Sequence, residues 1–288
     1  MKNISIYNAS KSIIRDLEKE IEQIFCNTGI YFRLFSRIKQ SKSITEKIEK
    51  KRLEHENNSY KIQDYIGFRI VVYFRDDIQI CDDILNRKYS IINKSIDKLE
   101  SDKFAPKRTN YVVKLPEIHQ HIIPHDLQDT VDFTFEIQLR TIFSEGWHEV
   151  EHDLRYKCKE DWENYKEEER ILNGVLATLE NCDWAISKLF DDLSYSNYKN
   201  KEWEKMIKNK FRVHIASSNL DKKIITILND NNDTAKAIFR TNRIEILKLM
   251  AEHTLPFSYD NLIYTTLLHE KIECNIAIPE AIKKLSPS

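Results

Sequence analysis

The stretch Val131-Asp132-Phe133-Thr134-Phe135-Glu136-Ile137-Gln138-Leu139 alternates between apolar and polar side chains. This period of two over nine residues predicts a β-strand with one buried face and one polar face. Glu136, Gln138 and Arg140 project together on the polar face if the strand extends to residue 140. Two interpretations stay open at this point: a functional surface, or the solvated outer face of an edge strand.

Shorter strand and helix patterns surround this stretch. Ile66–Phe74 and Tyr111–Leu115 are rich in β-branched and aromatic residues, which predicts two further strands. Apolar residues at helical spacing predict helices over 9–26, 41–56, Ile142–Lys159 and Trp162–Leu189. Strands mixed with helices in this order predict an α/β domain that ends near residue 195.

The rest of the chain has a different character. Leu193–Lys201 is rich in Ser, Asn, Tyr and Lys, which predicts a polar linker. Residues 202–288 show helical patterns over Thr234–Ala251 and Tyr259–His269, so we expect a helical C-terminal extension. Its apolar helical faces need something to pack against, and three roles stay open: an oligomerisation arm, a regulatory lid and a self-neutralising segment.

Charge balance and glycine content exclude several classes of protein. The 288 residues include 45 Lys and Arg against 46 Asp and Glu, so no global field draws the chain to nucleic acid or to an anionic membrane. The four glycines are too few and too far apart for a P-loop or a dinucleotide-binding fingerprint. We therefore expect any phosphate site to be built largely from side chains.

The spacing of the cysteines and the length of the apolar runs indicate where the protein is located. The five cysteines include no CxxC pair, which argues against a cysteine-based zinc site and a disulfide scaffold. No apolar run has the length of a signal-peptide core or a membrane span. We expect a cytoplasmic protein that does not contact a membrane.

A basic run is the first candidate binding site. Arg37 and Lys39 fall on one side of an extended chain, while Ser43 and Lys47 are i,i+4 neighbours on a helix. Cations grouped in this way bind a triphosphate through charge-assisted hydrogen bonds. The alternative is a solvated basic helix.

An acidic residue before a strand is the second candidate. Asp64 precedes the apolar run from Ile66, and Gly67 and Arg69 follow it. A carboxylate at this place suits a magnesium ion that bridges phosphates, and glycine permits close backbone approach. The alternative is an ordinary turn before a strand.

The run His148-Glu149-Val150-Glu151-His152 matches the His-Glu-x-x-His pattern of zinc proteases. Such a site needs a third ligand, and the many acids between Glu160 and Glu169 supply one only by chance. We prefer a second pattern that accounts for the same residues.

Taken together, the runs resemble the synthetase domain of the RelA/SpoT family. The motifs that carry the resemblance are Arg-x-Lys-x-x-x-Ser-Ile-x-x-Lys from Arg37, Asp-x-x-Gly-x-Arg from Asp64, Glu-Ile-Gln-Leu-Arg-Thr from Glu136, Trp147, and Glu-His-x-Leu-x-Tyr-Lys from Glu151. The resemblance implies a nucleotidyltransferase-like α/β fold with a mixed sheet flanked by helices. The expected organisation is an N-terminal helix over 1–30, the synthetase domain over 31–195 and the helical extension over 202–288.

The family transfers the β,γ-pyrophosphate of ATP to the 3′-hydroxyl of GDP or GTP. Carried over to this sequence, Asp64 would hold Mg²⁺, and Glu136 would complete the metal site or act as general base on the attacking hydroxyl. The ATP side would consist of Arg37, Lys39, Ser43, Lys47 and Arg69. The acceptor side would consist of Lys107, Tyr111, Gln138, Arg140 and His152.

The acceptor loop departs from the family pattern Pro-Lys-x-Asn-Gly-Tyr-x-Ser-x-His, in which the tyrosine stacks on guanine. The sequence here is Pro106-Lys107-Arg108-Thr109-Asn110-Tyr111-Val112-Val113-Lys114-Leu115, with Val113 and Leu115 in place of Ser and His. Three hypotheses stay open: an alarmone synthetase with an altered guanosine pocket, a toxic relative that modifies the 3′ end of tRNA, and an inactive nucleotide-binding module. A homo-oligomer or an antitoxin partner is compatible with the first two.

The family's hydrolase domain, with a manganese-binding His-Asp pair, normally precedes the synthetase domain. About thirty residues precede the motifs here and they have a helical pattern, while His152-Asp153 lies inside the synthetase motifs. We expect a synthetase without hydrolase activity.

Overall fold

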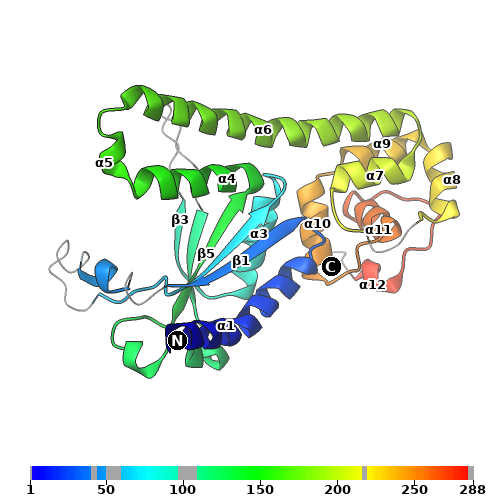
Figure 1. The fold of residues 1–288 in the computed structure, drawn as a ribbon. Helices are drawn as coiled ribbons and strands as arrows, with labels where there is room; N and C mark the ends of the chain where they lie inside the picture. The colour runs from blue at the N-terminus through cyan, green and yellow to red at the C-terminus, as the bar shows by residue number, and fades with distance from the viewer. Residues whose placement is uncertain (1, 40–43, 50–59, 97–108, 216–218, 285–288) are drawn as a thin grey trace. The chain divides into compact units, whose positions relative to one another are not determined.

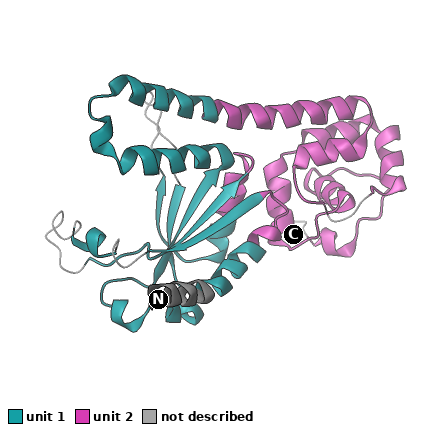
Figure 2. Cartoon of the chain, in the orientation of Figure 1, with its two compact units in different colours: residues 1–23, 32–72, 84–179 teal, residues 24–31, 73–83, 180–288 magenta. Residues whose placement is uncertain are grey.

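The computed structural model describes residues 2–39, 44–49, 60–96, 109–215 and 219–284. It divides into two compact units whose segments alternate along the sequence (Figure 2). Unit 1 comprises residues 1–23, 32–72 and 84–179, and unit 2 comprises residues 24–31, 73–83 and 180–288. Each unit is described in turn.

Unit 1 is built on a mixed five-stranded sheet (Figure 1). Its spatial order is β1-β2-β5-β4-β3. The β2–β5 pair is parallel, while β1–β2, β4–β5 and β3–β4 are antiparallel. The strands are β1 (Phe32–Ile38), β2 (Ile66–Val72), β3 (Ile91–Ile96), β4 (Thr109–Lys114) and β5 (Thr134–Thr141). The expected α/β fold with a mixed sheet is confirmed.

The central strands show why the sequence forms this sheet. In β2, six of the seven residues are buried, as a strand with neighbours on both sides requires. In β5, Phe135, Ile137 and Leu139 are buried on one face, while Glu136 and Gln138 are partly exposed on the other. The period-two prediction is confirmed for 134–139, and Val131 forms only an isolated bridge with Ile62.

Helices cover both faces of the sheet. On the apolar face lies α1 (Lys2–Cys26), where Glu18 accepts a hydrogen bond from Ser36 of β1 at 2.8 Å. The opposite face is covered by α4 (Ile142–Glu151), which contacts β2 and β5. Trp147 of α4 is buried and donates from Nε1 to the carbonyl of Leu172 in α6 at 3.1 Å. The polar face of β5 therefore lies under α4, and it is not a solvated outer surface.

Several short elements complete unit 1. A five-residue π-helix (His152–Tyr156) continues α4 and is followed by α5 (Lys159–Trp162). Two 3₁₀ helices, Glu117–Ile122 and His125–Leu127, join β4 to β5. The predicted helix over 41–56 is helical at 44–49, and its other residues lie outside the described residues.

Two predictions about the second half of the chain are wrong. The expected linker over Leu193–Lys201 is mostly helical, because α6 runs without interruption from Lys166 to Lys199. The expected helix Thr234–Ala251 is two helices, since Asn242 caps a new helix through a hydrogen bond to the Ile244 amide. The helix Tyr259–His269 is confirmed.

Unit 2 packs short helices against the second half of α6 and the start of α3 (Asp77–Lys88). The further helices are α7 (Trp203–Phe211), α8 (Lys222–Asp230), α9 (Asn232–Arg240), α10 (Arg243–Glu252), α11 (Tyr259–His269) and α12 (Glu280–Lys283). None of the helices in the described part of the chain combines the length and the apolar composition that crossing a bilayer requires.

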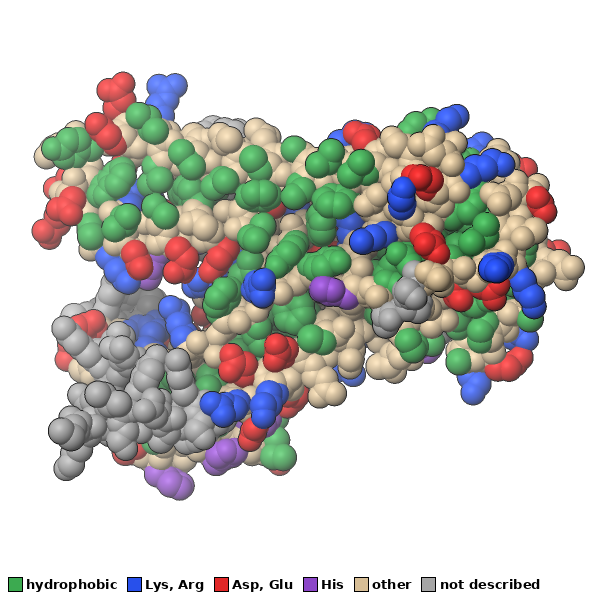
Figure 3. Space-filling view, turned by 45° about the vertical axis from the view of Figure 1, so that its right-hand side comes forward, with side chains coloured by type: hydrophobic (Ala, Val, Ile, Leu, Met, Phe, Trp, Pro, Cys, Tyr) green, Lys and Arg blue, Asp and Glu red, His purple; other side chains and the backbone are tan. Residues whose placement is uncertain are grey.

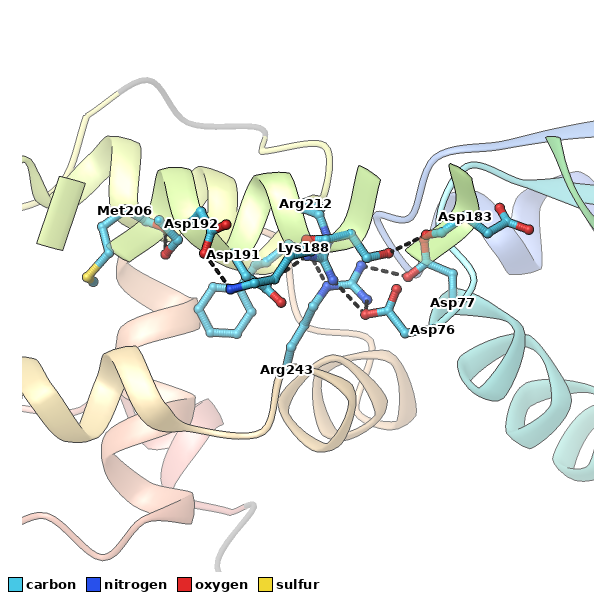
Figure 4. Close-up of polar contacts among 12 residues, drawn as sticks. Asp76, Asp77, Asp183, Lys188, Asp191, Asp192, Met206, Arg212 and Arg243 are labelled. Carbon is cyan, nitrogen blue, oxygen red and sulfur yellow. Dashed lines mark hydrogen bonds and ion pairs between the residues drawn. The ribbon is translucent and has the colours of Figure 1, made fainter. Parts of the chain in front are cut away.

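A buried ion-pair cluster lies inside unit 2 (Figure 4). Arg243 donates to Asp76 at 2.9 Å and to Asp77 at 2.6 Å, and its Nε donates to the carbonyl of Phe211 at 2.7 Å. Arg212 donates to Asp76 at 2.6 Å and to Asp191 at 3.0 Å. Asp76 and Asp77 come shortly after the end of β2 at Val72, so this cluster holds the segment between β2 and α3.

Candidate active site

Two rows of side chains cross the polar face of the sheet. The first row joins Arg37 of β1, Gly67 of β2 and Glu136 of β5, which are Cα partners in register. The second joins Arg69 of β2 to Gln138 of β5. Partners in register project to the same face of a sheet, so Glu136 and Gln138 share one face with Arg37 and Arg69.

Gly67 lies against the Arg37 side chain. A Cβ atom built on Gly67 would lie 3.5 Å from both Cγ and Nε of Arg37, at ordinary contact distance. An alanine here would therefore touch the arginine without displacing it, and Gly67 has no positive φ that would require glycine.

Asp64 binds two lysines that come from different segments. Its Oδ2 atom accepts hydrogen bonds from Nζ of Lys39 and from Nζ of Lys47, both at 2.7 Å. Lys39 follows β1 directly, and its backbone N–H donates to the carbonyl of Tyr65 at 2.8 Å. Lys47 lies on the helical segment 44–49. The basic cluster and the acidic turn of the sequence thus form one site.

The protonation states of this group follow from burial and pairing. Burial acts to raise the pKa of Asp64, but the hydrogen bonds from Lys39 and Lys47 outweigh it and hold the pKa below its usual value. Burial lowers the pKa of Lys39, and the opposing attraction of Asp64 is too weak to restore it. Asp64 is therefore a carboxylate at neutral pH.

The Glu136 carboxylate is held by a chain of hydrogen bonds. Gln138 donates from Nε2 to Oε2 of Glu136 at 2.9 Å, and its Oε1 accepts from Nε of Arg69 at 3.1 Å. Arg69 also donates to Glu145 at 2.5 Å and to Glu149, both on α4. Burial acts to lower the pKa of Arg69, but the two glutamates raise it, so the guanidinium stays charged.

Glu145 and Glu149 were not assigned a role from the sequence. They stand four residues apart on α4 and both contact Arg69, so α4 fixes this arginine from above the sheet. Their i,i+4 spacing was visible in the sequence, but the arginine they share lies 76 and 80 residues away.

No group of three or more His, Cys, Asp or Glu residues is arranged to hold a metal ion in the described part of the chain. The His-Glu-x-x-His run therefore gains no support as a zinc site. Asp64 has a different property: its Oδ1 atom is buried and has no hydrogen-bond partner among the described residues. An unpartnered buried carboxylate oxygen fits a hard divalent cation that one or two carboxylates and substrate phosphates hold together.

The residues of this site lie in the part of the chain that is similar to known proteins. Residues 36–161 match the model of a region found in RelA and SpoT proteins. This interval contains Arg37, Lys39, Asp64, Arg69 and Glu136. Over this interval the chain is similar to the RelA/SpoT family.

Two curated relatives come from Bacillus subtilis (strain 168). GTP pyrophosphokinase YjbM is 28% identical over 166 residues, which are 55% of this chain and 68% of the relative. GTP pyrophosphokinase YwaC is 31% identical over 130 residues, which are 44% of this chain and 59% of the relative. The match to YwaC thus covers less than two thirds of that protein.

A solved structure of a GTP pyrophosphokinase family protein from Streptococcus pneumoniae shares the fold. It has a TM-score of 0.50 and 21% sequence identity, and the match covers 67% of this chain and 94% of that chain. The likeness therefore extends to the fold of the chain as well as to its motifs.

The acceptor side of the site differs from the expectation. Tyr111, Val113 and Leu115 are all fully buried. Tyr111 is the Cα partner of Ile137, which places it on the face opposite Glu136. In this structure Tyr111 is a core residue, so its placement argues against the expected stacking on an acceptor base. The valine and leucine in place of Ser and His fit the same apolar face.

The remaining acceptor-side residues fall in different places. Arg140 is buried and donates to Oδ1 of Asn110 at 3.0 Å, on the same face as Gln138. His152 is half-exposed and contacts Asp153 at 2.9 Å and the ring of Tyr156. Ser43 and Lys107 lie outside the described residues. Asn110, the Cα partner of Gln138, is thus a polar residue of the same sheet face.

Proposed function

We propose that this chain transfers the β,γ-pyrophosphate of ATP to the 3′-hydroxyl of GDP or GTP. The observation that carries the proposal is the row Arg37–Gly67–Glu136, in which a cation and a carboxylate lie on one sheet face together with the Asp64 group nearby in the sequence. The similarity to YjbM and YwaC, both GTP pyrophosphokinases, supports the same activity.

Three cations would bind the polyphosphate of ATP. Arg37, Lys39 and Lys47 come from the end of β1 and from the following helical segment. Lys39 and Lys47 now share one carboxylate oxygen, and phosphate oxygens offer them the same kind of acceptor. ATP binding therefore exchanges one anionic partner of the lysines for another, which limits the net cost of desolvation.

Asp64 and Glu136 would hold Mg²⁺ together with the substrate. The unpartnered Oδ1 atom of Asp64 fits this role, and its other oxygen becomes available when the lysines turn to phosphate. The ion would neutralise charge on the phosphates during transfer.

The transfer itself assigns a role to Glu136. The 3′-oxygen of the acceptor forms a bond to the β-phosphorus of ATP, the bond from that phosphorus to the bridging α-β oxygen breaks, and AMP leaves. Glu136 accepts the proton of the 3′-hydroxyl, with its carboxylate oriented by Gln138. Gln138 is in turn oriented by Arg69.

A second acceptor, the 3′ end of tRNA, is favoured by one observation. Tyr111, Val113 and Leu115 are buried, so the loop offers neither the stacking ring nor the two polar contacts that a guanosine pocket of the family uses. An acceptor bound mainly through its phosphates needs none of these contacts.

The deciding experiment incubates the chain with γ-labelled ATP and, separately, GDP, GTP or bulk tRNA. Label in a guanosine nucleotide supports alarmone synthesis, and label in RNA supports the tRNA acceptor. Absence of transfer to all three, with ATP binding retained, would show an inactive nucleotide-binding module and refute both activities.

A further inference from the structure

Strand β4 carries a polar side chain on the face of the sheet that holds Glu136. The residues of β4 alternate between buried positions and positions that are at least partly exposed. Asn110 and Val112 hold two of the partly exposed positions, and their Cα partners on β5 are Gln138 and Glu136. A ligand bound at Glu136 therefore has both of these β4 side chains beside it.

The side-chain amide of Asn110 has a fixed orientation. Its Oδ1 atom accepts a hydrogen bond from Nη2 of Arg140 at 3.0 Å. A guanidinium group only donates, so the oxygen of the amide has to face it. Arg140 is buried and also donates to the carbonyl of Leu139 at 2.7 Å, which holds it in place. Asn110 thus presents its Nδ2 atom with two N–H donors, and this atom has no hydrogen-bond partner in the described part of the chain.

This amide is a difference from the RelA/SpoT sequence pattern. The pattern Pro-Lys-x-Asn-Gly-Tyr has glycine where this chain has Asn110, so the pattern provides no side chain at that position. On the opposite face of the same strand, Tyr111 is buried in the core, and Val113 and Leu115 replace polar residues. The loss of polar groups on one face of β4 thus comes with the gain of one on the site face.

The charged groups of the site face lie on other strands. Arg37, Arg69 and Glu136 belong to β1, β2 and β5, and Figure 3 shows acidic and basic side chains gathered at the left of the view, in unit 1. Such charges suit a polyphosphate and its metal ion. Asn110 and Val112 are uncharged, which suits a nucleobase. Asn110 is a diagonal neighbour of Glu136, about 7 to 8 Å away between Cα atoms, which is within the length of one nucleoside.

We propose that Asn110 binds the edge of the acceptor base and selects a purine with an oxygen at carbon 6 over adenine. This inference rests on the proposed function, because it takes the 3′-hydroxyl of the acceptor to lie at Glu136. The N–H groups of Asn110 can donate to O6 and N7 of guanine, which are both acceptors. Adenine carries an amino group at carbon 6, so its donor would face the donors of Asn110.

The inference distinguishes the two acceptors considered for this chain. The 3′-terminal nucleotide of tRNA is an adenosine, whose amino group Asn110 would oppose, whereas GDP and GTP offer O6 and N7. Discrimination of this kind takes place at the edge of the base and needs no aromatic ring on its face. The burial of Tyr111 is therefore compatible with a guanosine acceptor.

The first test changes the acceptor and leaves the protein unaltered. Transfer from labelled ATP is measured with GDP, with ADP and with the 5′-diphosphate of 2-aminopurine riboside, which lacks O6 and keeps the amino group of guanine. We expect kcat/KM to fall by about tenfold or more when O6 is absent, because the donors of Asn110 lose their acceptor. Equal use of GDP and the 2-aminopurine nucleotide, better use of ADP than of GDP, or label in tRNA alone would overturn the inference.

Asn110→Ala tests whether this residue is the one that reads O6. The variant should use GDP about tenfold less well than the wild type and should no longer distinguish GDP from the 2-aminopurine nucleotide. Its KM for ATP should stay unchanged, which a general loss of structure would not allow. Asn173→Ala makes the same change at an exposed position of α6 and should preserve the discrimination. An Asn110→Ala variant that distinguishes the two acceptors as the wild type does would refute the assignment.

Asn110→Asp tests the direction of the hydrogen bond. A carboxylate keeps a partner for Arg140 and replaces the two donors by an acceptor. The preference should therefore move from GDP toward the 5′-diphosphate of 2,6-diaminopurine riboside, which has an amino group at carbon 6. A variant that is folded by circular dichroism and still prefers GDP to the same extent would contradict the proposed contact.

Binding measurements separate this inference from the proposed function. Calorimetric titration with GDP and with the 2-aminopurine nucleotide, in the presence of a non-hydrolysable ATP analogue, measures recognition without transfer. Binding that depends on O6 and is lost in Asn110→Ala, in a chain that transfers nothing, would refute the proposed function and support the base contact. Transfer to GDP, with O6-dependent binding unchanged in Asn110→Ala, would support the proposed function and refute the base contact.

Discussion

Gln138 donates a hydrogen bond to the carboxylate of Glu136 at 2.9 Å, two residues away on the same strand. The side-chain amide of Gln138 cannot exchange the positions of its oxygen and nitrogen, because the oxygen accepts a hydrogen bond from Arg69 on the neighbouring parallel strand. The sheet thus fixes the orientation of the one carboxylate of β5 that faces the site, and both residues should matter for transfer in different ways.

Glu136→Gln should abolish transfer while it leaves ATP binding nearly unchanged. The substitution keeps the shape and the hydrogen bond from Gln138 but removes the base, which typically costs 10²- to 10⁴-fold in rate. Initial rates with labelled ATP, together with equilibrium binding of ATP, measure the two effects. Glu117→Gln makes the same change at an exposed position outside the site and should leave the rate unaltered. Retention of activity in Glu136→Gln would refute its assignment as base.

Gln138→Leu should lower kcat by about tenfold or more, with a smaller change in KM for ATP, because the residue orients Glu136 and does not bind the donor. Gln138→Glu separates its two contacts, since a carboxylate still accepts from Arg69 but cannot donate to Glu136. We expect this variant to be at least as impaired as Gln138→Leu. Normal activity in Gln138→Glu would show that only the Arg69 contact matters.

Asp64→Asn should change the response to divalent cations. The variant loses the carboxylate that would hold Mg²⁺, so saturation of activity should require more magnesium and the maximal rate should fall at least 10²-fold. Without magnesium, ATP should bind more tightly than to the wild type, because Lys39 and Lys47 no longer share a carboxylate. Calorimetric titration with ATP, with Mg²⁺ and with chelator, measures both effects. An unchanged magnesium dependence would contradict the metal assignment.

The sequence predicts some parts of this site better than others. The alternation over 134–139 is local, so β5 and the common face of Glu136 and Gln138 follow from it directly. The face of Tyr111 could not be predicted in this way, because a shift of one residue in register moves a side chain to the other side of a sheet. The family motif implied that the ring of Tyr111 is available for stacking, whereas the pairing with Ile137 places Tyr111 in the core.

Long-range partners escape local patterns altogether. Asp64 and its lysines stand 25 and 17 residues apart, and their meeting follows from the antiparallel β1–β2 pair. β1 was not predicted as a strand, because its polar residues Arg33, Ser36 and Arg37 interrupt the apolar pattern. Asp76 and Arg243 are separated by 167 residues, and nothing in either neighbourhood indicates the pairing.

Removing Arg243 should destabilise unit 2 strongly. Arg243→Met leaves the buried carboxylate of Asp77 without its cation, and breaking a buried pair from one side typically costs about 3 to 5 kcal/mol. Adding Asp77→Asn should recover part of this loss, because the remaining group is then neutral. Urea unfolding followed by tryptophan fluorescence measures both, with exposed Arg240→Met as the control. A loss below about 1 kcal/mol would show that the cluster contributes little.

Lys210 should make the stability of the chain rise with pH. Burial lowers its pKa from 10.5 to about 8, against the attraction of Asp191. Below pH 8 the lysine is charged in both the folded and the unfolded chain, and the folded state bears the full cost of the buried charge. Between pH 8 and 10.5 the unfolded chain binds more protons, so stability increases with pH, by about 3 kcal/mol in total.

Lys210→Met removes this dependence. The variant should be more stable than the wild type below pH 8, and the difference should vanish as the pH approaches 10.5. The free energy of unfolding in urea, measured at intervals from pH 7 to 10.5, follows the convergence. Lys208→Met, at an exposed position of the same helix, should change stability by less than about 0.5 kcal/mol at every pH. If the Lys210→Met and wild-type curves stay parallel, the lysine is not buried as a costly charge in unit 2.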